Sequence, residues 1–538
     1  MSRGKKLFLT SFLTLIALIA VGQFHHNADP TGNKTGGTAD FLAASGRAKV
    51  QLSQSGVNAL ANEVGHLHVS INFTWLLITG FLVLFMQVGF AFLVTGLTRA
   101  KNAGHMMMMN LSSFVIALLA YYAIGFAFQF GGINLVGGTG NIGGTGPLNS
   151  LFGHGNAGVI GLHGFFLQSG NSYDVGVLAF FLFQVVFMET AGYIIIGAIA
   201  ERITFAAFIC AEIAMGAIIY PIYGNWVWGG GWLSQLGHSL DLGHGAVDFA
   251  GSGVVHATGG WAALALAMLL GPRIGKYRKD GTVRAFPGHN LGYVVIGTLV
   301  LTFGWMGFNP GSTFGATDLR IAIVAVNTLL AASAGAVMAM AWTNWKWGKP
   351  DISMTCNGML AGLVAITAPC AFVAPWASLV IGMIAGVLVC WSVSFFDNKA
   401  KIDDPCGAIS VHGMCGAWGL LAVGLFADGT YPAKVVGWNG VPGGVTGLFY
   451  GGDGAGQLLA QAIDLVVGFI WAWGATYLIF LVVRRFVKMR VDPEVEIEGL
   501  DEGEFGQICY PDFVIRAETD TGITHELDAV GAPGTDPS

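Results

Sequence analysis

Two histidines stand at matching positions inside apolar runs, and their type and spacing suggest chemistry. His256 lies in residues 254–261 (V-V-H-A-T-G-G-W), and His412 lies in the similar stretch 410–417 (S-V-H-G-M-C-G-A). A neutral imidazole has one donor and one acceptor nitrogen and changes charge near neutral pH. Two facing imidazoles can therefore hold a small polar molecule, share a proton or relay one.

Two other interpretations of the histidines stay open. Either histidine alone is typical of a hydrogen bond between helices, and the two together suggest a metal site. No carboxylate or thiolate stands at a ligand spacing beside His256 or His412, which argues against a metal. The matched positions favour a shared functional role, and we predict neither a metal nor a cofactor.

Aromatic residues suggest a site for a small cation. Trp228 lies in the stretch N-W-V-W-G-G-G (225–231), and Trp305 and Ser312 lie in G-W-M-G-F-N-P-G-S (304–312). A cation over an aromatic ring gains about 0.5–1 kcal/mol when exposed and about 2 kcal/mol when desolvated. Single tryptophans are equally typical of anchors at a membrane surface.

Two acidic residues lie close to these stretches. Asp248 precedes His256 by eight residues, and we expect it to cap that helix and to stiffen the cation site. Glu189 lies within an apolar run, where a charged group costs about 2.5–3.5 kcal/mol on insertion scales. It is either a packing carboxyl between helices or a group that handles protons, and its role is left open.

The composition places these residues in a membrane. Of 538 residues, 54% are hydrophobic and only 10% are charged, whereas soluble domains have about 25% charged residues. Apolar runs long enough to cross a bilayer recur, and they predict an all-α polytopic membrane protein with eleven transmembrane helices. We expect the helices at about 70–97, 105–130, 174–199, 204–223, 247–271, 290–308, 320–343, 353–373, 376–396, 406–427 and 458–483.

The two histidine stretches fall in the fifth and tenth spans, which indicates a five-helix repeat followed by a final helix. Because five is odd, the two halves are inverted in the membrane. Inverted repeats place the substrate site at the repeat interface near the midplane. We therefore predict that His256 and His412 face each other.

Outside the spans, the chain divides into four predicted segments. Residues 1–22 are typical of a signal peptide, residues 23–65 of a loosely ordered exported polar segment, residues 66–490 form the membrane domain, and residues 491–538 are an acidic tail. Loops after odd-numbered spans carry 16 lysines and arginines against five on the other side. The positive-inside rule then puts the N-terminus outside and the tail in the cytoplasm.

The sequence lacks signals for other classes of protein. Neither G-x-x-x-x-G-K-[ST] nor H-E-x-x-H occurs, and the seven cysteines form no C-x-x-C pair. We therefore predict that the chain is not an enzyme and binds no nucleic acid. A sensor that binds a small cation and signals through its tail stays open as the alternative to a protein that moves the cation across the membrane.

Taken together, the motifs resemble the ammonium transporter family (Amt, with its Mep and Rh relatives) over residues 70–505. The matching stretches are 197–202 (G-A-I-A-E-R), 227–231, 248–256, 304–312, 357–367 and 403–416. The resemblance implies an inner-membrane ammonium channel that forms a homotrimer, and a cytoplasmic tail that contacts nitrogen-signalling proteins of the PII class.

The same resemblance implies roles for individual residues. Ammonium recruitment falls on Trp228, Ser312 and Phe187, and a paired phenylalanine gate on Phe187 and Phe308. The remaining positions are the pore-lining Trp305 and the twin histidines His256 and His412. The resemblance implies that ammonium loses its proton before ammonia passes the histidines. Gly407 stands where some relatives have an aspartate, and Glu189 stands where many relatives have an uncharged residue.

Overall fold

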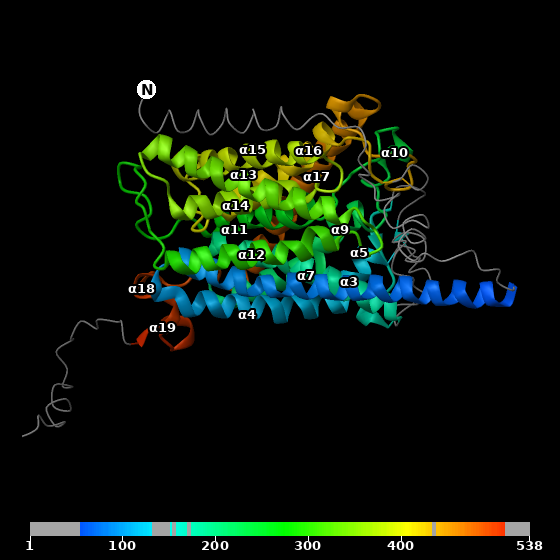
Figure 1. Ribbon diagram of the computed structural model, residues 1–538. Helices are drawn as coiled ribbons and strands as arrows, with labels where there is room; N and C mark the ends of the chain where they lie inside the picture. The colour runs from blue at the N-terminus through cyan, green and yellow to red at the C-terminus, as the bar shows by residue number, and fades with distance from the viewer. Residues whose placement is uncertain (1–53, 132–150, 153–157, 169–173, 433–436, 512–538) are drawn as a thin grey trace, which may run out of the picture.

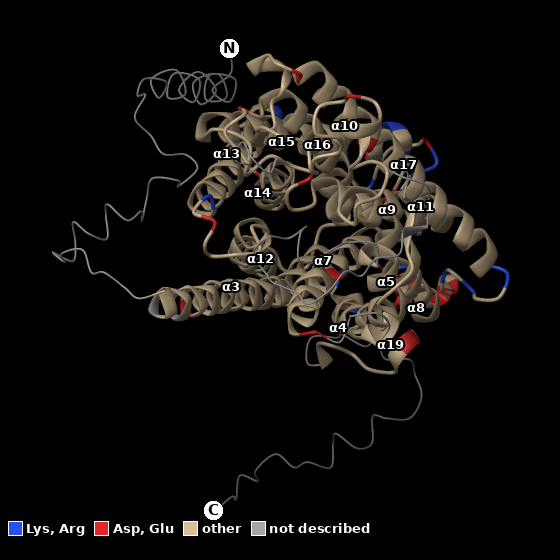
Figure 2. Ribbon diagram, turned by 90° about the vertical axis from the view of Figure 1, so that its right-hand side faces the viewer, with Lys and Arg blue, Asp and Glu red and all other residues tan. Residues whose placement is uncertain are grey.

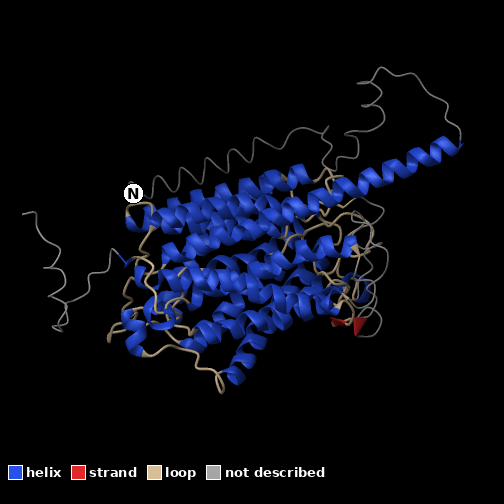
Figure 3. Ribbon diagram, turned by 90° about the horizontal axis from the view of Figure 1, so that it is seen from below, coloured by secondary structure: helices blue, strands red, loops and turns tan. Residues whose placement is uncertain are grey.

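The computed structural model describes residues 54–131, 151–152, 158–168, 174–432 and 437–511. In this part of the chain nearly every element is a helix, and the long helices run side by side (Figure 1). Two very short antiparallel strands, β1 (Leu151–Phe152) and β2 (Ile160–Gly161), lie at one end of the bundle (Figure 3). The predicted all-α membrane architecture is confirmed.

The main helices follow the apolar runs. In chain order they are α3 (Gln54–Leu97), α4 (Ala103–Ala120) with η2 (Tyr121–Gly125) and α5 (Phe126–Phe130), α7 (Val175–Ile199), α8 (Phe205–Ala214) with η4 (Met215–Ile219) and α9 (Tyr220–Val227), η5 (Ser252–Ala257) with α11 (Thr258–Leu270), α12 (Leu291–Gly311), α13 (Ile321–Trp347), α14 (Ile352–Thr367), α15 (Pro375–Phe395) with η6 (Phe396–Ala400), η7 (Ile409–Met414) with α16 (Cys415–Phe426), and α17 (Gly454–Val483). The short helices are η1 (Ala100–Asn102), η3 (Phe165–Leu167), α10 (Leu236–Ser239), η8 (Leu448–Tyr450), α18 (Pro493–Glu498) and α19 (Leu500–Phe505).

Ten helical segments of the described chain are long and apolar enough to cross a membrane. The shorter apolar helix α14, of 16 residues, occupies the position predicted for the eighth span. The predicted count of eleven spans therefore depends on α14. Seen along the helices, the ribbons are mostly uncharged, and Lys, Arg, Asp and Glu gather at helix ends and in loops (Figure 2).

The first helix differs from the expectation at its start. Helix α3 begins at Gln54, so residues 54–65 of the predicted polar segment are helical, and this end projects beyond the other helices (Figures 1 and 3). Extending an existing helix adds one hydrogen bond per residue without a new nucleation cost. The predicted signal peptide, residues 1–22, lies outside the described residues.

The beginning of the acidic tail packs against the end of the bundle near α4. Both carboxylate oxygens of Asp501 accept hydrogen bonds at the start of α4, from the N–H groups of Gly104 (2.9 Å) and His105 (2.7 Å). Glu496 pairs with Arg490 at 2.9 Å. The Asp501 hydrogen bonds satisfy N–H groups that the start of a helix leaves without a partner inside the helix.

An ion cluster ties three loops together at the same end of the bundle. Arg273 binds Asp403 with its Nε (2.8 Å) and Nη2 (2.9 Å), and its Nη1 lies 3.0 Å from Glu201. Arg99 also donates to Glu201, through its backbone N–H at 2.6 Å. Burial alone raises the pKa of Asp403 and of Glu201, but Arg273 outweighs it and holds both pKa values below their ordinary range.

We predict that Asp403→Ala destabilises the protein by roughly 3–5 kcal/mol at neutral pH, because Arg273 is left as a buried charge without its main partner. The unfolding midpoint in detergent measures this. The lowered pKa of Asp403 means that its contribution is present above its unfolded pKa and is lost as the pH falls. The difference between the variant and the wild type should therefore shrink below about pH 4.

The matched control is the exposed pair Lys488–Asp492, whose side chains are 58% and 62% exposed. Lys488→Ala should cost less than about 1 kcal/mol, since water screens such a pair. Equal effects of the two substitutions would contradict the role given to the buried cluster.

Candidate functional site

The two predicted histidines meet in the interior of the bundle. The Nδ1 atoms of His256 and His412 are 3.3 Å apart, and the ring centroids are 5.3 Å apart. Each histidine sits in a π-helical turn, His256 in η5 and His412 in η7. Such turns are rare and are frequent at functional sites. Sequence periodicity did not indicate them.

Two glycines allow the histidine turns to approach so closely. Gly260 and Gly416 each follow a histidine by four residues. A Cβ at Gly260 would lie 2.2 Å from the backbone nitrogen of Gly413, and a Cβ at Gly416 would lie 2.4 Å from the backbone oxygen of Ser252. Small residues let membrane helices approach at backbone distance. The repeated position shows that the crossing obeys the same twofold relation as the histidines.

Two aspartates cap the histidine turns in the same way. Asp248 accepts hydrogen bonds from four backbone N–H groups at the start of η5, those of residues 251–254, at 2.8–2.9 Å. Asp404 accepts hydrogen bonds from the N–H groups of residues 407–409 at the start of η7, at 2.8–3.1 Å. Both aspartates precede their histidine by eight residues.

The sequence interpretation named Asp248 but missed Asp404 as its counterpart. The shared eight-residue offset was the signal that could have found it. Burial raises the pKa of Asp404 to about 6, and the backbone donors oppose that rise. The neighbouring Gly407 adopts φ +77°, a conformation that favours glycine.

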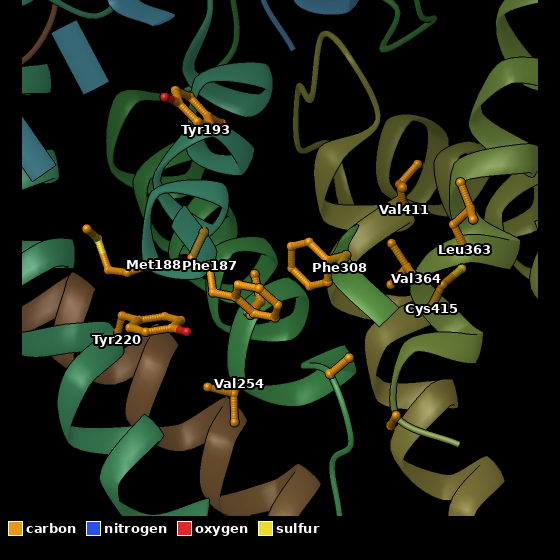
Figure 4. Close-up of a cluster of buried hydrophobic side chains, with 14 of the residues drawn as sticks. Phe187, Met188, Tyr193, Tyr220, Val254, Phe308, Leu363, Val364, Val411 and Cys415 are labelled. Carbon is orange, nitrogen blue, oxygen red and sulfur yellow. The ribbon is translucent and has the colours of Figure 1, made fainter. Parts of the chain in front are cut away.

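Aromatic rings continue from the histidines as a stacked column. His256 lies against Trp305 (centroids 5.1 Å apart) and Phe308 (5.3 Å). Phe308 stacks on Phe187 at 4.0 Å, and Phe187 meets Trp228 edge-on at 6.2 Å. Figure 4 shows Phe187 and Phe308 next to each other at the centre of the buried cluster. The structure thus brings the predicted gate residues together beside the histidines.

The remaining predicted residues support this column. Ser312 donates its hydroxyl hydrogen to the carbonyl oxygen of Phe308 at 2.8 Å. The Trp228 indole donates to the backbone oxygen of Asp248 at 2.7 Å, so Asp248 braces both the histidine turn and Trp228. Trp305 donates to Thr367 at 2.9 Å.

A small cavity borders His412 but not His256. It has a volume of about 20 Å³ and is lined by His412, Tyr193 and Phe90 among others, which is room for about one water molecule. Asn357 and Cys406 border both this cavity and a larger one of about 170 Å³, which reaches Arg273 at the end of the bundle. The two cavities mark a route from the histidines to that end.

One polar atom in the site has no partner in the protein. The Nε2 atom of His256 is buried and makes no hydrogen bond, and buried polar atoms are usually satisfied. A bound polar molecule can supply the hydrogen bond that this atom lacks. In the part of the chain that the structure describes, no group of three or more His, Cys, Asp or Glu side chains is arranged to hold a metal.

Glu189 lies outside the column. It is on α7 with Phe187, but two residues further along, which turns its side chain roughly 200° away around the helix. The structure therefore does not bring Glu189 to the gate, and its surroundings are described below.

The chain is similar to proteins of known family. The Ammonium Transporter Family matches residues 74–510. Ammonium transporter Amt2 of Archaeoglobus fulgidus is 48% identical over 446 residues, which are 82% of this chain and 89% of the relative. Ammonium transporter Amt1 of Haloferax mediterranei is 35% identical over 468 residues, 84% of this chain and 82% of the relative. Both relatives are transporters and not enzymes, as predicted from the sequence.

Solved structures give the same result. A structure titled Sensor Amt Protein aligns with a TM-score of 0.70 at 35% identity, covering 82% of this chain and all of that chain. Mep2 of Candida albicans aligns with a TM-score of 0.65 at 27% identity, covering 79% of this chain and 87% of that one.

We predict that Gly260→Ala lowers the free energy of unfolding by about 1–3 kcal/mol, because its Cβ meets backbone that cannot move aside. The control is Gly474→Ala in α17, where nothing lies within 4 Å of the added Cβ. That change should be neutral or slightly stabilising. The unfolding midpoints of the two variants in detergent decide the matter, and equal midpoints would refute the close-crossing argument.

Proposed function

We propose a mechanism of ammonium transport for this chain, which belongs to the Ammonium Transporter Family by the match over residues 74–510. Ammonium is recruited at Trp228, Ser312 and Phe187, and it loses its proton near the gate of Phe187 and Phe308. Ammonia then passes His256 and His412. The contact between the two histidine rings, 3.3 Å between Nδ1 atoms, is the observation that carries the proposal.

The donor and acceptor nitrogens of the two histidines are suited to binding a neutral molecule. In a bond between two neutral Nδ1 atoms, one ring donates and the other accepts. The Nε2 atom of the donating ring is then an acceptor, and the Nε2 of the other ring carries hydrogen. The pair thus offers ammonia both an acceptor for its N–H groups and a donor for its lone pair.

The apolar surroundings disfavour an ion at the same place. Taking an ion out of water costs several kcal/mol unless partners replace its hydration shell. Phe308 and Trp305 beside His256 are 0% exposed and offer only ring faces. Ammonium avoids most of this cost by giving up a proton, whereas potassium has no proton to give. Selectivity against potassium follows from that difference.

The setting of the transporter is also part of the proposal. The 16-to-five distribution of basic residues supports an outside N-terminus and a cytoplasmic tail in a cell's inner membrane. The family supports a homotrimer and a signalling partner of the PII class at the tail. The packing of α18 and α19 near α4 is the surface such a partner would disturb.

We predict that His256→Ala/His412→Ala abolishes selective ammonium transport, because neither ring remains to bind ammonia. The measurement is the current and the luminal pH change in proteoliposomes after an ammonium pulse, with potassium as the control cation. A current lost in the variant indicates coupled movement of proton and ammonia, and alkalinisation without current indicates a neutral ammonia channel. Selective transport that persists in the variant would reject the role of the histidines.

A sensor is the second candidate, favoured by the similarity to the structure titled Sensor Amt Protein. A sensor would bind ammonium in the same site and move its tail with little flux. Cys509 is exposed in the tail, and the other six cysteines are buried or partly buried, so one fluorescent label can report on the tail.

For a transporter, we predict an ammonium flux well above that of empty liposomes, whatever the label at Cys509 reports. A saturable fluorescence change without flux above that background would instead establish the sensor. Alanine at both histidines should remove either response if it arises at the proposed site.

A further inference from the structure

Two buried glutamates lie beside the column without a charged partner. Glu189 on α7 is 1% exposed and Glu212 on α8 is 0% exposed. Three of their four carboxylate oxygens make no hydrogen bond, and the fourth accepts one from the Ser113 hydroxyl at 2.8 Å. Carboxylates at such depth are expensive and call for a function.

Gly192 leaves room for the Glu212 carboxyl beside α7. A Cβ at this position would lie 2.5 Å from Oε2 of Glu212, so the carboxyl would have to shift to accommodate it. Glu189 precedes Gly192 by three residues, which places it on the same side of the helix. The Glu212 carboxyl therefore reaches the turn of α7 that carries Glu189.

No cation neutralises the pair. The elements packed against α7 and α8 are α3, α4, α9, α11, α17, η2, η4 and η5, and none of them contains lysine or arginine. The titratable groups on these elements are Glu63, His66, His68, His105, Tyr121, Tyr122, Tyr220, Tyr223, His256, Asp464 and Tyr477. Two neighbouring carboxylates without a cation cannot both ionise cheaply, so at least one of them holds a proton.

Tyr193 connects the pair to the conducting route. It lies one turn beyond Glu189 on α7, is 2% exposed, and its hydroxyl makes no hydrogen bond. Its ring stacks on Phe90 (5.4 Å) and lines the cavity of about 20 Å³ together with His412. In Figure 4, Tyr193 lies well apart from Phe187, away from the gate.

We propose that Glu189 and Glu212 form a proton-binding site that exchanges one proton with the cavity beyond His412 through the Tyr193 hydroxyl. A proton from the aqueous end of the route reaches the pair when the tyrosine oxygen accepts it and passes its own hydrogen to a carboxylate, which becomes a carboxylic acid. When ammonia arrives in the cavity, the tyrosine gives it a hydrogen and takes one back from the carboxylic acid. Ammonia then becomes ammonium and the carboxylate is restored. This use of the site rests on the proposed transport function.

An ordinary packing role explains the contacts less well. A carboxyl that only joins two helices donates to a defined acceptor on the neighbouring helix. Here three carboxylate oxygens lack a hydrogen-bond partner, and the Tyr193 hydroxyl, one turn further along α7, makes no hydrogen bond either. The arrangement suits a proton that moves among several oxygens.

Infrared spectroscopy of the protein in liposomes tests the proton directly. The wild type should show a carboxylic acid C=O band that shifts on exchange into heavy water, and Glu189→Gln and Glu212→Gln should each remove or shift it. Tyr193→Phe should keep the band but slow its exchange. Persistence of an unchanged band in both glutamine variants, or unchanged exchange in Tyr193→Phe, would overturn the proposal.

Transport supplies the second readout. The pH profile of the ammonium-induced current should shift in Glu189→Gln and in Glu212→Gln. Asp464→Asn is the matched control, because Asp464 is equally buried but bonded to the Tyr223 hydroxyl at 2.8 Å, and it should leave the profile unchanged. If the pH profile is unshifted in both glutamine variants while histidine replacement still abolishes transport, the proton-binding site is refuted and the transport function is not. Absence of transport in the wild type would instead refute the transport function, and the infrared result would stand by itself.

Discussion

The close crossing of the two histidine turns is the constraint on which the other features of the site depend. Helix α11 meets η7, and α16 meets η5, at backbone distance because Gly260 and Gly416 have no Cβ. Packed helices usually lie about 8–10 Å apart, and a Cβ at either glycine would push these two apart. The π turns then aim both rings at the crossing point, and the caps by Asp248 and Asp404 hold those turns at their starts. The twofold repetition of glycine, turn and cap makes one side of the crossing a copy of the other.

The bilayer explains how the polar groups are distributed. A membrane interior supplies no water to satisfy an unpaired group, so hydrogen bonds must close within the protein. The buried ion cluster around Arg273 obeys this rule at the end of the bundle, where paired charges join three loops. Asp248 and Asp404 obey it with seven backbone donors between them. Among the buried side-chain atoms that have no hydrogen-bond partner, those of His256, Glu189, Glu212 and Tyr193 lie at the site or on the helices beside it.

Much of the fold could be predicted from the sequence, because a span of hydrocarbon demands about 20 apolar residues whatever the tertiary contacts. The meeting of His256 and His412 could also be predicted, since the repeat fixed their relation. The extension of α3 to Gln54 and the 16-residue length of α14 could not, because helix ends depend on local cooperativity and neighbouring helices. The nearness of Glu189 and Glu212 could not be predicted either, since it arises where the Glu212 side chain reaches α7 beside Gly192, and no sequence periodicity records such a contact.

Helix α7 joins the two parts of the site that the proposals distinguish. One side of it carries Phe187 in the aromatic column, and another carries Glu189 and Tyr193. The proposed ammonia route is narrow and apolar at the 4.0 Å stack of Phe187 on Phe308. A proton needs the opposite surroundings, oxygens and hydroxyls in sequence. With the aromatic column on one side of α7 and the proton-binding groups on another, the ammonia route stays apolar. The proton acceptors still lie close to the cavity that His412 lines.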